Sequence, residues 1–189
     1  PLTMEIISIL ENSQDKKAVT YLASLLRFKK KSILLRTIEA IGKYKNPKSN
    51  RILLPFLDDP DKDIRIRSAR NIPLPQEKEI QEEIIKRVRQ KSFLKKTPEE
   101  KAILIDLLAA AGSKESLAVL KDIIKSVGFL AKRRKKETGL YAVSSIKRTK
   151  NPLAQNILEE GKKSRNKAIR EACRKAITDK IAFSSPGSA

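Results

Sequence analysis

The sequence contains no His and no Trp, and only 4% of its residues are aromatic. Without His there is no His-ligated metal site and no Ser-His-Asp triad. The single Cys173 excludes an intrachain disulfide and any Cys-x-x-Cys site. No apolar run reaches the roughly 18 residues that a membrane span needs, and no secretory signal is visible. We therefore expect no metal, no cofactor and no membrane span, and a cytoplasmic location.

Gly and Pro are also few, with six and nine residues among 189. An all-β chain needs more turn residues than this. Hydrophobic residues make up 40% of the chain and charged residues 34%, both too high for disorder. The apolar set is almost entirely Ile, Leu, Ala and Val, which favours helices packed through aliphatic seams. Because the chain begins with Pro1 rather than Met, we expect it to be a piece of a longer protein.

Positive charge is in excess, with 42 Lys and Arg residues against 22 Asp and Glu residues and a formal net charge of +20. The excess is uneven: residues 121–189 hold 18 of the basic residues and only six of the acidic ones. Net charge governs association rather than fold. The C-terminal third is therefore predicted to carry the surface for a negatively charged partner.

The chain repeats itself at an offset of 105 residues. The sequence Ile41–Pro47 (IGKYKNP) resembles Ile146–Pro152 (IKRTKNP), and Ile64-Arg65 corresponds to Ile169-Arg170 in the same register. An offset of 105 fits three units of about 35 residues, which is near the length of known two-helix repeats. The sequence therefore predicts a stack of helix pairs.

Helix signals fit this unit. Asn46-Pro47 begins a helix that we expect to reach Leu57, and Pro75 opens a later one. Thr97–Glu100 is a capping box. Apolar residues recur at helical spacing, and no segment alternates with a period of two. We predict an all-α, right-handed α-solenoid of about five helix pairs, with one domain over residues 1–182 and a flexible tail over residues 183–189.

The segment Leu53–Ala69 (LLPFLDDPDKDIRIRSA) resembles the HEAT-repeat turn pattern LL-DD-PD-x-x-VR-x-x-A, and Ala168–Ala172 repeats its second half. The stretch 129–136 also resembles bacterial HEAT-repeat proteins of unassigned function. The resemblance implies an α-solenoid of the HEAT or armadillo type, whose members mostly bind other proteins. It covers most of the chain by pattern, but only one unit by close motif.

The resemblance also implies structural roles for four residues. In the family, a turn Asp and an Arg bond between neighbouring repeats, and Asp61 or Asp63 with Arg65 would fill these roles. Arg170 matches the Arg in the last unit, but residues 164–166 lack the acidic side chains, which puts its bond in doubt. The acidic residues of the turn are therefore interpreted as helix caps rather than as a Ca²⁺ site, since the mid-loop Gly and final Glu of an EF-hand are missing.

Two basic clusters are the candidate partner-binding residues. Five consecutive cations at residues 132–136 repel one another at a predicted helix N-terminus, where the helix dipole is already positive. This arrangement is costly unless something negative approaches; the alternative is a solvated face. The candidates are Lys132, Arg133, Arg134, Lys135, Lys136, Lys162, Lys163, Arg165, Lys167 and Arg174.

Three functions compete. The first is a non-catalytic scaffold that binds an acidic protein partner through a basic face, and it is the one we expect, with a monomeric chain. The second is nucleic-acid binding through the phosphate backbone, for which clustered Lys and Arg suffice, although stacking residues are few. The third is a HEAT-like DNA glycosylase, but the Trp residues that line such sites are missing. We therefore expect no enzymatic activity.

Overall fold

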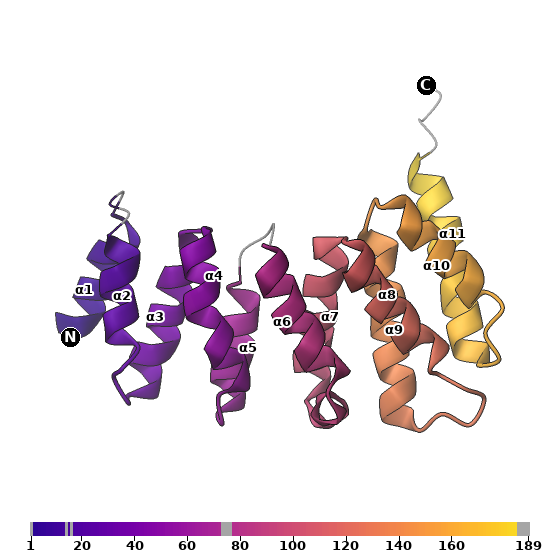
Figure 1. Cartoon of the computed structure of the whole chain (residues 1–189), viewed down its shortest axis with the longest axis horizontal. Helices are drawn as coiled ribbons and strands as arrows, with labels where there is room; N and C mark the ends of the chain where they lie inside the picture. Colours follow the sequence, from indigo (N-terminus) through magenta and orange to yellow (C-terminus); the bar gives the residue numbers. More distant parts are fainter. Residues whose placement is uncertain (1, 14, 16, 73–76, 185–189) are drawn as a thin grey trace. The chain divides into compact units, whose positions relative to one another are not determined.

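The computed structural model describes residues 2–13, 15, 17–72 and 77–184 (Figure 1). Over these residues it contains eleven α-helices, two short 3₁₀ helices and no strand. The expected all-α fold is thereby confirmed. Pro75 and residues 185–189 of the expected tail lie outside the described residues, whereas residues 183 and 184 belong to the last helix.

The chain divides into two compact units, Pro1–Ile80 and Gln81–Ala189. In the first unit, α1 packs against both α2 and α3, α3 packs against α5, and α2 packs against α4. Odd and even helices therefore form two layers, and α3 contacts α1 and α5 in its own layer and α2 and α4 in the other. The helices of this unit are α1 (Leu2–Glu11), α2 (Ala18–Leu25), α3 (Lys31–Lys43), α4 (Pro47–Leu53) and α5 (Lys62–Arg70), with the 3₁₀ helix η1 (Leu54–Asp58).

The second unit repeats this arrangement. There α7 packs against α8 and α9, α9 packs against α11, and α8 packs against α10 (Figure 1). Stacking of helix pairs in two layers is the packing of an α-solenoid, in which each pair buries its apolar stripe against the next. α6 (Lys78–Arg89) begins in the first unit and ends in the second. The remaining elements of the second unit are η2 (Lys91–Lys95), α7 (Pro98–Ala111), α8 (Lys114–Lys125), α9 (Arg133–Arg148), α10 (Pro152–Gly161) and α11 (Lys167–Ser184).

The helix boundaries follow the offset of 105 residues. α4 and α10 begin at Pro47 and Pro152, while α5 and α11 begin at Lys62 and Lys167. Each element is offset from its counterpart by six α-helices, which corresponds to three helix pairs. The internal repeat inferred from the sequence is thus a repeat of structure.

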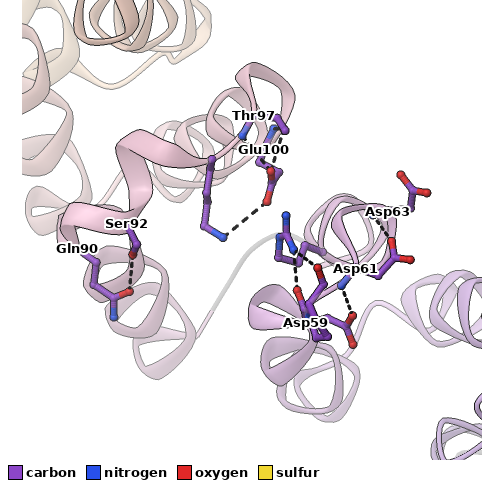
Figure 2. A network of polar contacts seen from close by, with 10 residues as sticks. Asp59, Asp61, Asp63, Gln90, Ser92, Thr97 and Glu100 are labelled. Atoms are coloured by element: carbon purple, nitrogen blue, oxygen red, sulfur yellow. Dashed lines mark hydrogen bonds and ion pairs between the residues drawn. The ribbon is translucent and has the colours of Figure 1, made fainter.

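Local chemistry explains most of these boundaries. The side chains of Asn46 and Asn151 cap α4 and α10 from the position before the first-turn Pro. Thr97 and Glu100 form the predicted capping box of α7 (Figure 2), and Gly112 ends that helix in the left-handed conformation, with φ 62°. The expected helix from Pro47 to Leu57 is wrong in one respect. α4 ends at Leu53 and a 3₁₀ turn follows, because Pro55 has no N–H for an α-helical bond.

Candidate functional site

The acidic turn between η1 and α5 is an arrangement of caps. Asp59 Oδ1 accepts a hydrogen bond from Asp61 N (2.8 Å), and Asp61 Oδ1 accepts one from Asp63 N (2.8 Å; Figure 2). Arg65 closes the turn by donating from Nη1 to the carbonyl oxygens of Asp59 (2.7 Å) and Pro60 (2.9 Å). These hydrogen bonds all lie within the turn and stabilise it, so its side chains have a structural role.

The same turn recurs before α11 with different side chains. Ser164 Oγ accepts a hydrogen bond from Asn166 N (3.2 Å), Asn166 Oδ1 accepts one from Ile169 N (3.3 Å), and Arg170 Nη1 donates to Ser164 O (2.7 Å). The Arg170 bond therefore needs no acidic side chain, because its acceptor is a backbone carbonyl. This bond stays within its own turn, so it differs from the bond between repeats that the resemblance implied for Arg170.

The bond between neighbouring helix pairs at the first turn involves Lys31. Lys31 Nζ, at the start of α3, lies 2.7 Å from Asp61 Oδ2 and 2.6 Å from Asp63 Oδ2. Hydrogen bonds to these carboxylates raise the pKa of Lys31, and the hydrogen bond from Lys31 lowers the pKa of Asp61. Asp61 and Asp63 thus link α5 to α3 through a lysine, a partner that the sequence did not suggest.

The first basic cluster, residues 132–136, lies at the N-terminus of α9, as the sequence predicts. Lys132 occupies the N-cap position without a side-chain cap, and Arg133 Nε lies 2.7 Å from Glu137 Oε1. Arg134, Lys135 and Lys136 form no ion pair within the part of the chain that the structure describes. Three cations thus face the positive end of the α9 dipole without a carboxylate to offset them.

The second basic cluster lies in the loop 162–166 and along α11. Lys162 pairs with Glu159, and Lys167 Nζ lies 3.9 Å from a Glu171 oxygen. Over the described ranges, the cluster members without an ion pair are Lys163, Arg165 and Arg174.

A hydrogen bond brings the two clusters to the same end of the second unit. Asn166 Nδ2 donates to Gly128 O (3.0 Å), so the loop 162–166 contacts the loop that leads into residues 132–136. Arg174 lies two turns further along α11. We call these two loops, residues 126–132 and 162–166, together with the first turn of α9, the basic loop end.

A cavity of about 440 Å³ lies at the basic loop end, between α8 and α10. Its lining includes Lys163 and Arg165 of the loop 162–166, Lys121 and Lys125 of α8, and Glu160 of α10. Glu160 accepts from Lys121 (2.6 Å) and lies 2.9 Å from Lys125 Nζ, and these hydrogen bonds lower its pKa to about 2. Sequence reasoning missed this triad, which joins residues almost 40 positions apart.

Two large apolar side chains next to the cavity are exposed. Phe129 is 76% and Leu130 88% exposed, and only Ala131 separates them from the first basic cluster. The sequence contains a signal for them, because three apolar residues, 129–131, lie between Gly128 and a basic run, outside any helical stripe.

Buried ionisable groups are engaged structurally. Glu100 Oε2 accepts from Thr97 N (3.0 Å) within the capping box, and burial lowers the pKa of Lys101, whose Nζ lies 3.5 Å from Leu94 O. Burial raises the pKa of the Cys173 thiol to about 11, so it is protonated at neutral pH. The described residues contain no group of three His, Cys, Asp or Glu side chains placed to hold a metal ion. Across the same residues, no helix has both the length and the apolar character to span a bilayer.

The two-layer stacking and the internal repeat define an α-helical repeat protein of the α-solenoid class. No protein-family model matches the chain, and no curated protein matches it. Solved structures that it is similar to include human deoxyhypusine hydroxylase in complex with glycerol, at 12% identity and a TM-score of 0.46, covering 96% of this chain and 80% of that one. A designed armadillo repeat protein is 14% identical, with a TM-score of 0.44 and coverage of 93% and 98%. An engineered protein is 12% identical, with a TM-score of 0.45 and coverage of 95% and 89%.

Proposed function

We propose that this chain is a non-catalytic helical-repeat scaffold whose basic loop end binds an acidic protein partner. The observation that carries the proposal is the gathering of six cations, each without an ion pair in the described structure, at one end of the second unit. They are Lys132 at the N-cap of α9, Arg134, Lys135 and Lys136 of α9, and Lys163 and Arg165 of the adjoining loop. The proposal retains the cytoplasmic location expected from the sequence.

Electrostatics supports this assignment. Like charges at a helix N-terminus each cost a fraction of a kcal/mol, typically about 0.3–1 kcal/mol at low salt. A carboxylate-rich surface would remove this cost and would also speed association, because complementary charge steers the encounter. Cations without an ion pair also occur elsewhere in the described chain, for example Lys62, Lys91 and Lys95. What distinguishes the basic loop end is that a hydrogen bond between its two loops holds several such cations at one end of the second unit.

The test is a charge reversal with a matched control. Reversal of Arg134, Lys135 and Lys136 to Glu changes the charge by six units without touching an apolar stripe. The control reverses Lys62, Lys91 and Lys95 to Glu, which are exposed and lie outside the basic loop end. Both variants should fold, and only the first should lose partners in a nuclease-treated pull-down. Equal capture by both variants would reduce the cluster to a solvated face.

Salt dependence separates the protein partner from nucleic acid, the alternative occupant. Duplex DNA binding should weaken with a log–log slope of about −0.9 for each phosphate neutralised, so several contacts give a steep slope. A protein partner with an apolar centre gives a shallower slope, because exposed charges mainly change the association rate. Two results together would favour nucleic acid over a protein partner. The captured material would be lost after nuclease treatment, and binding to duplex DNA would show the steep dependence on salt. Turnover of alkylated DNA by the chain would contradict the non-catalytic part.

A further inference from the structure

The apolar pair Phe129 and Leu130 is held at the tip of an ordered turn. Ala131 N donates to Gly128 O (3.2 Å), which places the pair at the two central positions of a four-residue turn. The same carbonyl accepts from Asn166 Nδ2 (3.0 Å), so the base of the turn is tied to the loop 162–166. Val127, just before the turn, is buried. The two exposed side chains are thus presented on a fixed base rather than on a frayed segment.

A projecting apolar tip and a hollow lie side by side at the basic loop end. Gly128, which begins the turn, also lines the cavity of about 440 Å³. Ile124, Val127 and Ile157 supply its apolar lining, while Lys163 and Arg165 supply positive charge. Exposed apolar side chains beside an apolar cavity, with cations nearby, fit a protein interface with a hydrophobic centre and a polar rim.

We infer that Phe129 and Leu130 are the apolar anchor of this docking surface, and that the partner is an acidic protein with an apolar pocket that takes up both side chains. The inference rests on the proposed function and names the chemistry of its partner. Leu130 has no aromatic face on which a base could stack, so nucleic acid gains nothing from it. A flat bilayer surface could cover the tip but would leave the cavity beside it unfilled. A protein partner has an uneven surface, so it can cover Phe129 and Leu130 and fill the cavity beside them at the same time.

Photo-crosslinking at the tip identifies the partner. Phe129 is replaced by p-benzoylphenylalanine in cells that make the full chain, and Leu153 of α10, 45% exposed, receives the same replacement as the matched control. We expect one acidic protein to crosslink from position 129 and not from position 153. The crosslinked protein is identified by mass spectrometry and purified, and its binding to the full chain is titrated calorimetrically. If crosslinking from position 129 does not exceed that from position 153, the inference is overturned.

Titration of the purified partner separates the inference from the proposed function. Phe129→Ala and Leu130→Ala should each raise Kd at least about tenfold, since truncation of a buried anchor at an interface centre commonly costs that much or more. Leu153→Ala should change Kd by less than about twofold, and the melting temperature should be unchanged in all three variants because these side chains are exposed.

Each alternative outcome has its own meaning. If the alanine variants bind normally while reversal of Arg134, Lys135 and Lys136 abolishes binding, the proposed function stands and the apolar anchor is wrong. If the reversal also leaves binding intact, both are wrong. Vesicles of phosphatidylcholine and phosphatidylglycerol, and a DNA duplex, serve as further probes. Binding of either that depends on Phe129 and Leu130 would assign the tip to lipid or nucleic acid and overturn the inference.

Discussion

Asn166 donates a hydrogen bond from Nδ2 to the carbonyl oxygen of Gly128 (3.0 Å), and its Oδ1 accepts one from Ile169 N (3.3 Å). One buried amide therefore caps the first turn of α11 and ties two loops that are 38 residues apart. The bond places the basic residues 132–136 beside the loop 162–166 and fixes the base of the turn that presents Phe129.

Asn166→Ala should destabilise the fold by about 1–2 kcal/mol, because it removes a helix cap and leaves the Gly128 carbonyl without this donor. Asn156→Ala is the control, since Asn156 lies exposed on α10. Thermal unfolding followed by circular dichroism measures both. Similar melting temperatures for the two variants would show that the Asn166 bonds contribute little.

Arg65→Ala and Arg170→Ala should each destabilise the fold by about 1.5–3 kcal/mol, the usual range for hydrogen bonds that involve a charged group. Each guanidinium donates to a turn carbonyl six residues earlier. Lys30→Ala, at an exposed position, should cost less than about 0.5 kcal/mol. Urea unfolding gives the comparison. A normal midpoint for Arg170→Ala would mean that the last turn does not depend on its arginine.

Acid should weaken the first unit through Glu11. Hydrogen bonds from Arg36 and Lys43 lower the pKa of this buried carboxylate from 4.5 to about 2. A lowered folded-state pKa means that the stabilisation is complete above pH 4.5 and is lost as the pH falls toward 2. Glu11→Gln should therefore have a lower free energy of unfolding than the wild type at neutral pH. The difference between the two should become smaller as the pH falls. Glu5→Gln, at an exposed position on α1, is the control, and a gap that stays constant with pH would contradict the assignment.

The fold could be predicted from the sequence because its signals are local and periodic. The Asn-Pro starts of α4 and α10, the capping box at Thr97 and the apolar stripes all act within a few residues. The internal repeat can be recognised in the sequence because the same helix signals recur 105 residues later. The early end of α4 was missed, since Pro55 allows either a kinked helix or a 3₁₀ turn.

The site was harder to predict because its geometry depends on long-range contacts. No local pattern indicates that Asn166 pairs with Gly128, or Lys121 with Glu160, across 38 and 39 positions. Burial of Lys101 is likewise decided by packing of α7 against α9, not by its place in the helix. Phe129 and Leu130 have a local sequence signal, but the turn that presents them depends on the hydrogen bond from Asn166 to Gly128 O, which no local pattern indicates. The number of charged residues follows from the sequence, but which of them form ion pairs depends on the folded structure.

The close approach of α10 and α11 at Gly161 gives the last prediction. A Cβ added to Gly161 would lie 2.4 Å from Cys173 Sγ and 3.4 Å from Cys173 Cβ, well inside van der Waals contact for the sulfur. Because Cys173 is fully buried, its side chain has little room to move away. Gly161→Ala should therefore destabilise the fold by about 1–3 kcal/mol, the range for overpacked cores.

A second substitution tests this cause directly. Cys173→Ala removes the sulfur, so the double variant Gly161→Ala/Cys173→Ala should regain part of the loss, giving a favourable coupling energy of at least about 0.5 kcal/mol in a double-mutant cycle. Gly128→Ala is the matched control, because an added Cβ there would meet no heavy atom within 4 Å. Urea unfolding measures all four variants. If the two single substitutions prove additive, the contact between residues 161 and 173 does not set the spacing of these helices, and the glycine at position 161 needs another explanation.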